Sequence, residues 1–422
     1  MARRVARFAV PATLRFAGPE ARRWQRVRRA DRTERLIARC GPPPSDDRPT
    51  MTRLVLAPLL LASLLLGGCA TFAPDRVADC APARPPVEYD PATGEASTRL
   101  SVLTYNVEGL PWPARRSRSR QLDEIGRRLA EMRRRGEAPD VVLLQEVFTS
   151  AAGRIAERSG YANRVRGPGR RTPRQATSEA ADPALVDNRK LLKGERFGRL
   201  LSSGLYVLSD YPVIASAGQP FRRRECAGFD CMANKGVQHV RIAIPGVPAA
   251  IDLFNTHLNS GRSSRVGRRR SLRAHRLQVE EVARFIAARR DQRAPTIFGG
   301  DLNMRHNDER FAHFDQTVPH ALVHRHCTEP RAGCTVAISW DDDAPWMDTQ
   351  DLQGFADGAG IAIRPVQVEA MFDAPWRGRP LADHDGLLVT YRLSWPAMRL
   401  ASFGPAVPLC RPATAPGSRL GG

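Results

Sequence analysis

Several marks of common protein classes are missing from this sequence. It has no G-x-S-x-G element, which disfavours a serine hydrolase of the nucleophile-elbow type. No internal repeat is visible, so a repeat architecture is not expected. The apolar run over residues 54–66 is too short to span a bilayer comfortably. What remains is a chain of 422 residues, long enough for one large or two ordinary domains.

Cysteine is sparse, and its spacing disfavours a metal cluster. After residue 69 there are six cysteines, and no close pair has the CxxC spacing with nearby histidines that zinc favours. An even number of cysteines in an exported chain favours disulfides instead. Proximity in the sequence predicts three, joining Cys226 to Cys231, Cys327 to Cys334, and Cys80 to Cys410.

Residues 51–68 have the features of a signal peptide. A charged start precedes the apolar run, and Leu-Gly-Gly-Cys69 follows it. This arrangement resembles a bacterial lipobox, in which cleavage leaves Cys69 as the lipidated first residue. We therefore expect a membrane-anchored protein of the cell envelope. Because Ala70 is not Asp, the outer membrane of a Gram-negative bacterium is the expected location.

The composition divides the chain into one folded region with unstructured flanks. Residues 1–50 are rich in Arg and Pro and have no apolar face, so they are predicted to be a disordered, non-native extension. The Pro- and Ala-rich residues 69–97 are predicted to form a tether. Residues 98–396 are predicted to form the folded domain, and residues 397–422 a tail. The net charge of +21 favours phosphate-bearing partners.

Polar side chains recur where predicted buried strands end. Three such strands end at Asn106, Glu146 and His257, and a fourth opens into Gly-Gly-Asp301-Leu-Asn303. Side chains at i and i+2 of a strand point the same way. Asp301 can therefore orient a water while Asn303 donates to a substrate oxygen.

Two basic helices are predicted over residues 118–135 and 268–290. Asp383 and His384 form an Asp-His pair just before the last predicted strand. Carboxylates, amides and histidines at strand ends are suited to hydrolysis of a phosphate ester. A carboxylate can hold a divalent cation, amides and histidines can face phosphoryl oxygens, and an Asp-backed His can move a proton.

The order of these stretches resembles the endonuclease/exonuclease/phosphatase superfamily, which also contains deoxyribonuclease I and the bacterial and neutral sphingomyelinases. The matching stretches are Tyr-Asn-Val at 105–107, Leu-Gln-Glu at 144–146, Asn-Thr-His-Leu at 255–258, Gly-Gly-Asp-Leu-Asn at 299–303 and Asp-His at 383–384. The resemblance implies an α/β fold, a four-layer αββα sandwich in which two packed mixed β-sheets are flanked by helices. It also implies that the catalytic residues gather at one rim.

The resemblance further implies a metal-dependent phosphoric diester hydrolase. Mg²⁺, or Mn²⁺, would bind Glu146 with help from Asn106, while His257 and Asn303 would steady the phosphate.

The same resemblance implies that Asp383 orients His384. Either Asp301 or His384 would activate the water, and the sequence leaves both open. Members often have Ser where this chain has Ala382, a difference expected to affect the surroundings of the site rather than to abolish the chemistry.

Three functions follow from these observations. Asn234-Lys235-Gly236 and the short loop from Cys226 to Cys231 are more similar to the sphingomyelinase branch, so the leading expectation is a monomeric phosphodiesterase acting on phospholipid head groups. The basic helix at 268–290 would instead suit a nuclease acting on DNA or RNA. A lipoprotein that binds an anionic ligand without turnover is the third reading.

Overall fold

The structure, a computed structural model, describes residues 75–337, 350–398 and 407–410. Every described residue belongs to the compact unit Ala70–Gly422. The predicted signal peptide and Cys69 lie outside the described residues. Within those residues, no helix is long and apolar enough to cross a membrane.

The described part of the chain contains one sheet of eight strands. Its order is β11-β13-β14-β2-β3-β5-β4, with β1 paired to β2. Strands β2 and β3 run parallel, whereas β2 and β14 run antiparallel, so the sheet is mixed. The strands are β1 (Glu88–Asp90), β2 (Glu95–Asn106), β3 (Val141–Gln145), β4 (Asn163–Arg166), β5 (Tyr206–Ser209), β11 (Thr335–Val336), β13 (Ala362–Met371) and β14 (Gly386–Pro396).

The second sheet has six strands among the described residues, in the order β10-β12-β9-β8-β7-β6. It is also mixed, because β8 and β9 are parallel and β9 and β12 are antiparallel. Its strands are β6 (Val213–Pro220), β7 (Gly236–Ile242), β8 (Ile251–His257), β9 (Thr296–Asp301), β10 (Ala321–Leu322) and β12 (Asp351–Ala356).

Alternating side chains pack the two sheets together. Val102 of β2 and Leu253 of β8 lie in the core between the sheets. Their neighbours Leu103 and Phe254 point to the outer faces. This alternation follows from the twofold side-chain period of a strand, and burying both faces of each sheet requires a covering layer on each side.

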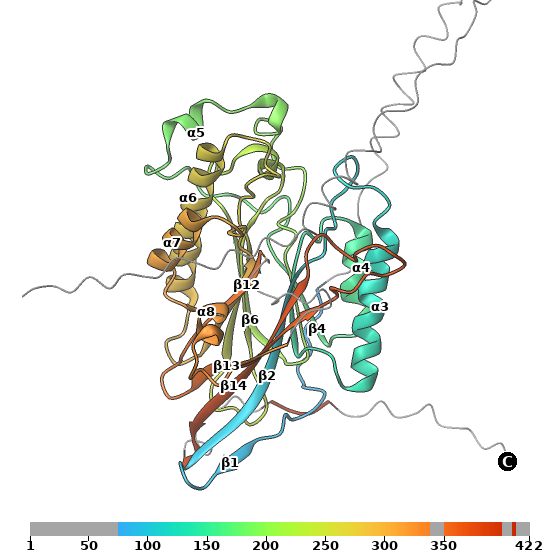
Figure 1. The fold of residues 1–422 in the computed structure, drawn as a ribbon, viewed down its shortest axis with the longest axis vertical. Coiled ribbons are helices and arrows are strands. Elements are labelled where there is room, and N and C mark those ends of the chain that lie inside the picture. The colour runs from blue at the N-terminus through green and yellow to red at the C-terminus, as the bar shows by residue number, and fades with distance from the viewer. Residues whose placement is uncertain (1–74, 338–349, 399–406, 411–422) are drawn as a thin grey trace, which may run out of the picture. The chain divides into compact units, whose positions relative to one another are not determined.

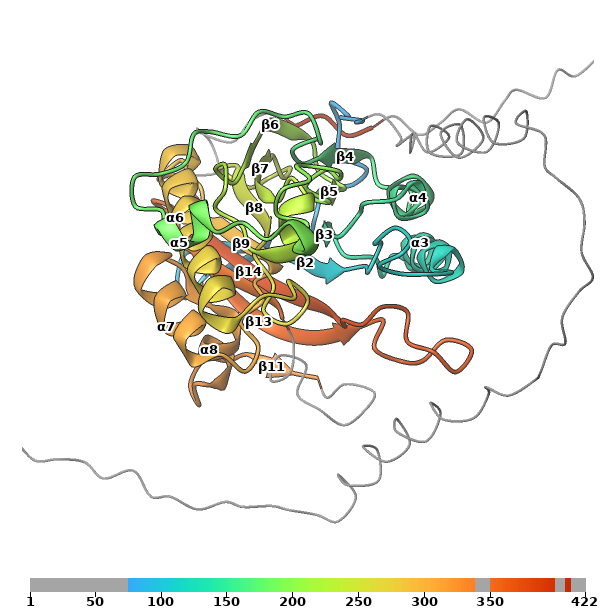
Figure 2. The same ribbon diagram turned by 90° about the horizontal axis from the view of Figure 1, so that it is seen from above.

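Helices supply those outer layers (Figures 1 and 2). Apolar residues of α3 (Ser119–Arg135) and α4 (Ser150–Arg158) pack on the first sheet, and those of α6 (Arg268–Arg289) and α7 (Asp308–Thr317) pack on the second. Further short helices are α5 (Pro183–Asp187), α8 (Val323–Thr328), η3 (Leu191–Lys193) and η4 (Gly228–Met232). The four-layer fold and the two predicted basic helices are thus confirmed.

Strand register brings the polar strand ends to one rim of the sandwich. Asn106 pairs with Gln145, and His257 pairs with Asp301. Tyr206, at the start of β5, pairs with Arg166, at the end of β4, so the segment between them also emerges at this rim. The segment around α5 accordingly lies at the end of the sandwich away from β1 (Figure 1).

All three predicted disulfides are present: Cys226–Cys231, Cys327–Cys334 and Cys80–Cys410. The last one corrects the predicted boundaries of the folded domain. It holds residue 410 beside residue 80, where the Ala81 amide donates to the Pro408 carbonyl (3.0 Å). With β1 and the start of β2 also preceding residue 98, the folded part begins earlier than predicted, and it includes part of the predicted tail.

Two buried carboxyl groups meet between α6 and the segment that follows β6. Glu281 accepts a hydrogen bond from the Arg222 amide (2.9 Å), and Glu225 accepts one from the Ser178 amide (2.7 Å). Both side chains are buried. Burial, together with the hydrogen bond to Glu225, raises the pKa of Glu281 to about 8.

The stability of the protein should therefore fall as the pH rises towards 8. An unfolded Glu titrates near about 4.3, so between that pH and about 8 the folded state holds a proton that the unfolded state has released. We expect the wild-type Tm to fall over this range by more than that of Glu281→Gln, which has no proton to lose. Glu157→Gln, at an exposed position of α4, is the control and should keep the wild-type slope. Equal slopes for wild type and Glu281→Gln in thermal unfolding would contradict this.

Candidate active site

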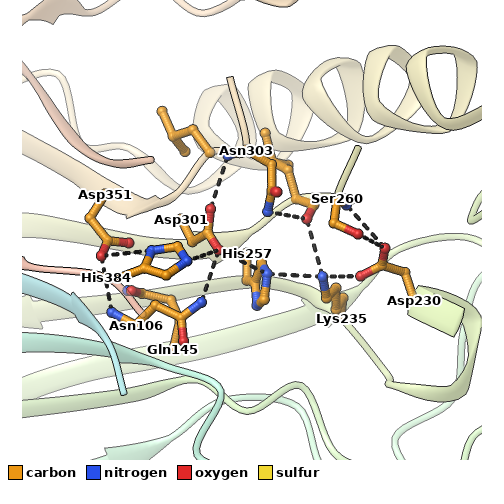
Figure 3. A network of polar contacts seen from close by, with 12 residues as sticks. Asn106, Gln145, Asp230, Lys235, His257, Ser260, Asp301, Asn303, Asp351 and His384 are labelled. Atoms are coloured by element: carbon orange, nitrogen blue, oxygen red, sulfur yellow. Dashed lines mark hydrogen bonds and ion pairs between the residues drawn. The ribbon is translucent and has the colours of Figure 1, made fainter. Parts of the chain in front are cut away.

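Asp301 lies at the centre of the polar cluster at the rim, at the end of β9 (Figure 3). Its Oδ2 accepts a hydrogen bond from Asn106 Nδ2 (2.9 Å) and lies 3.2 Å from His257 Nε2. Its Oδ1 accepts from the backbone amide of Asn303 (3.0 Å). The structure thus brings together four residues that the sequence predicted, from both sheets.

The neighbouring charges keep Asp301 ionised. Burial opposes ionisation, but His257, His384 and Lys235 outweigh it and hold the pKa of Asp301 well below its usual value. A carboxylate is therefore fixed at the centre of the cluster.

A close approach of two strands fixes the backbone before Asp301. Gly300 has φ 151°, and a Cβ there would lie 2.0 Å from the Thr256 carbonyl oxygen of β8. Any side chain would push β9 away from β8 and move Asp301. The second glycine of the Gly-Gly-Asp stretch is thus required by packing.

Asp351, not Asp383, contacts His384, which corrects the predicted pairing. His384 Nδ1 lies 3.2 Å from Asp351 Oδ2, and its Nε2 lies 4.0 Å from Asp301 Oδ2. Burial would lower the pKa of His384, but the charges of Asp351 and Asp301 outweigh it and raise that pKa well above its usual value.

The Asp383 carboxylate contacts Arg115. It forms an ion pair with Arg115 (2.8 Å), which also pairs with Glu108, and about half of the Asp383 side chain is exposed. Asp383 therefore lies at the edge of the cluster and orients Arg115.

Asp351 and Asp301 face each other directly across antiparallel strands β12 and β9. Two like charges in this position destabilise a sheet unless a positive group lies between them. Single ligand atoms of Asp301, Asp351 and His384 all lie within 4.8 Å of one another. This oxygen-rich set fits a hard divalent cation.

Glu146 and Asn106, the predicted metal ligands, lie beside this set. Burial raises the pKa of Glu146, while the charges of His257 and Lys235 work against the rise. Among the residues that the structure describes, the Glu146 carboxylate has no hydrogen-bond or ion-pair partner, which also suits a cation. Its backbone is left-handed (φ 58°), a costly conformation for a residue other than glycine, and Asn303 shares it (φ 51°).

A buried lysine extends the cluster on the side of His257. Lys235 Nζ lies 2.9 Å from His257 Nε2 and donates to the Leu258 carbonyl (3.2 Å). It also forms an ion pair with Asp230 of η4, whose Oδ2 accepts from Ser260 Oγ (2.6 Å). The row from Asp351 to Asp230 is visible in Figure 3.

Sequence reasoning missed Asp351, and it assigned no role to Lys235 or Asp230. The sequence signal for Asp351 is an acid at the start of a short apolar stretch. This acid becomes informative only when the stretch is known to form β12, which pairs antiparallel with β9. The signal for Lys235 is a lysine one residue before a buried strand, followed by Gly236, where a Cβ would lie 2.1 Å from the Gln219 carbonyl oxygen.

Known proteins similar to this chain include sphingomyelinases, and similar solved structures also include D. rerio TDP2 complexed with a single-strand DNA product. A sphingomyelinase of Mycobacterium bovis is 24% identical over 312 residues, which are 71% of this chain and 54% of that protein. The chain thus spans about half the length of the curated relatives it matches. Among solved structures, a beta toxin from Staphylococcus aureus aligns with a TM-score of 0.49 and 16% identity, covering 69% of this chain and 99% of that chain.

A sphingomyelinase C from Streptomyces griseocarneus aligns with a TM-score of 0.46 and 20% identity over 69% of this chain and 99% of that chain. The profile described as "Endonuclease/Exonuclease/phosphatase family" matches residues 103–367, more than half of the chain. The chain therefore belongs to the endonuclease/exonuclease/phosphatase family.

Proposed function

We propose that this protein is a Mg²⁺-dependent phosphodiesterase of the sphingomyelinase C type, which hydrolyses a phospholipid head-group ester by in-line attack of water. The observation that carries the proposal is the cluster around Asp301. It joins carboxylates suited to a cation with two histidines and two amides suited to a phosphate. The sphingomyelinase relative supports the choice of a lipid substrate.

Glu146, Asp301 and Asp351 are the residues that would hold the cation. The cation would supply positive charge to a phosphoryl oxygen and so stabilise the charge that develops there in the transition state. Mn²⁺ prefers similar oxygen ligands and is expected to substitute.

The other residues of the cluster bind the substrate and move a proton. Asn106 Nδ2 and Asn303 Nδ2 each have a second hydrogen besides the one donated to Asp301 Oδ2 and to the Leu258 carbonyl, and this hydrogen can donate to a phosphoryl oxygen. His257, beside Asp301, is the third candidate donor. Asp301 Oδ2 is already engaged by Asn106, whereas His384 Nε2 faces into the cluster with its ring held by Asp351. This geometry favours His384 for proton exchange with the reacting oxygens.

The basic helix α6 gives less support to a nuclease than its sequence suggested. Carboxylates lie within 4.0 Å of several of its arginines: Glu309 near Arg268 (3.0 Å), Glu195 near Arg270 (2.8 Å) and Glu280 near Arg284 (3.9 Å). Paired arginines contribute less to phosphate binding, since the existing contact must first be given up.

Substrate choice and metal use can be tested together. We expect the protein with Mg²⁺ to release phosphocholine from sphingomyelin vesicles and to leave plasmid DNA intact. Glu146→Gln should abolish turnover with the fold retained, because the amide keeps the shape but loses the charge that holds the cation. Near-normal activity of this variant at limiting Mg²⁺ would remove Glu146 from the metal site. Cleavage of DNA but not of lipid would favour the nuclease.

The corrected His384 partner gives a second test. Asp351→Asn should lower kcat by at least about two orders of magnitude, because the amide no longer stabilises the protonated ring of His384. Asp383→Asn, the matched control, should cost clearly less, since Asp383 contacts Arg115 rather than His384. Steady-state kinetics on a soluble chromogenic phosphodiester would measure both. A larger loss for Asp383→Asn would restore the original pairing.

We also propose that the enzyme is a lipoprotein anchored to the cell envelope through Cys69, in the outer membrane if the source is Gram-negative. A diacylglyceryl group plus an amide-linked chain exceeds the two hydrophobic signals needed for stable attachment. Cys69→Ser should move the protein out of the membrane fraction or leave it uncleaved. Mass spectrometry of the native N-terminus is decisive, and an unmodified mature chain starting at Ala70 or later would contradict the anchor.

A further inference from the structure

A short segment at the active-site rim exposes an unusual number of large apolar side chains. Four lie on the loop that contains η3, and the fifth lies on η4. We call this group the apolar knob. Its members and their exposed fractions are Leu191 (49%), Leu192 (86%), Phe197 (58%), Leu200 (50%) and Phe229 (39%).

The knob has a fixed framework. Glu195, in the middle of the loop, is buried, accepts hydrogen bonds from Arg270 Nε of α6 (2.8 Å) and from the Gly228 amide (2.8 Å), and also binds the Lys190 amide. The Leu200 amide donates to the Met232 carbonyl (2.7 Å). Because its backbone is tied down on both sides, the exposed side chains are held outward by a defined structure.

The two parts of the knob are in contact. A Cβ at Gly194 would lie 2.9 Å from Met232 Cγ and 3.2 Å from Phe229 Cδ1. The loop therefore rests directly on η4, and the apolar side chains of both belong to one surface.

This surface borders the catalytic cluster. Phe229 is exposed on η4. The next residue, Asp230, points inward to Lys235, which contacts His257 (Figure 3). A partner that covers the knob would thus lie beside the site, where a substrate embedded in that partner can reach His257.

The exposed charges of the loop that carries η3 are basic from residue 190 to residue 200, whereas Asp187, three residues earlier, is exposed and acidic. Within residues 190–200 the exposed or half-buried charged side chains are all basic, namely Lys190, Lys193, Arg196 and Arg199. The one acid of this stretch, Glu195, is buried and paired with Arg270. An apolar surface with basic side chains interspersed along it is complementary to a bilayer interface that carries anionic head groups.

We propose that the apolar knob is a docking surface that inserts into anionic lipid bilayers and presents the catalytic cluster to head groups. The inference deepens the proposed function and rests on it for the identity of the substrate. Three of the five exposed side chains are leucines, which bury well among acyl chains but offer no ring on which a base can stack. A nucleic-acid strand is therefore the weaker match.

The test uses a chain that begins at Ala70, which keeps the whole compact unit and lacks both the apolar run and Cys69. Its binding is measured by co-flotation with phosphatidylcholine vesicles, with and without phosphatidylglycerol. The variant is Leu192→Ser/Phe197→Ser. The matched control is Ile214→Ser, because Ile214 is 51% exposed on β6, near the end of that strand that lies away from Lys235. Hydrolysis of soluble bis(p-nitrophenyl) phosphate reports the chemistry separately.

We expect the double variant to lose at least about tenfold in binding to anionic vesicles, with unchanged hydrolysis of the soluble diester, while Ile214→Ser behaves as wild type. Lys193→Gln/Arg196→Gln should lose mainly the part of vesicle binding that depends on phosphatidylglycerol. It serves as the second variant if Leu192→Ser/Phe197→Ser folds poorly.

Vesicle binding equal to wild type in both knob variants would overturn the docking surface. So would a wild-type protein that binds only a single-stranded oligonucleotide and loses that binding in the double variant. If instead no phosphodiester is hydrolysed but vesicle binding still depends on the knob, the proposed function fails and the docking surface stands.

Discussion

The candidate site depends on the position of one β-sheet relative to the other. Asn106 ends β2 of the first sheet and His384 lies just before β14 of that sheet, whereas Asp301 and Asp351 belong to the second sheet. Asn106 nevertheless contacts Asp301, and His384 contacts Asp351. Buried amides hold the same interface below the site, where Asn255 of β8 donates to the Leu144 carbonyl (3.1 Å). A shift between the sheets would therefore separate Asp301 and Asp351 from Asn106 and His384.

This arrangement places like charges together and relies on positive groups to offset them. Asp301 and Asp351 face each other, and His384 on one side and the His257–Lys235 pair on the other lie around them. Buried carboxylates are tolerated only when such partners or a metal ion are present. The arrangement of charges at the site therefore lowers the stability of the fold. The left-handed backbone of Glu146 and Asn303 adds a further conformational cost.

Much of the fold and part of the site could be predicted from the sequence, for physical reasons that also explain the misses. The strand ends at Asn106, His257 and Asp301 were readable because apolar runs and the residues that follow them are local signals. Asp351 was not, because its role exists only through antiparallel pairing with a distant strand. The family resemblance implied that Asp383 orients His384, but the structure places Asp351 of a distant strand against His384 instead.

The close approach of β8 to β9 at Gly300 affects whether a relative of this protein can keep the geometry of the site. A substitution there would displace Asp301 while leaving every chemically active side chain in the sequence, since the obstacle is a backbone oxygen of the neighbouring strand. A homologue with all its acids and histidines but a larger residue at this position would keep the appearance of an enzyme without its geometry. A comparison of catalytic side chains alone would class such a homologue as active. The residue at the position of Gly300 would distinguish it from a homologue that keeps the geometry of the site.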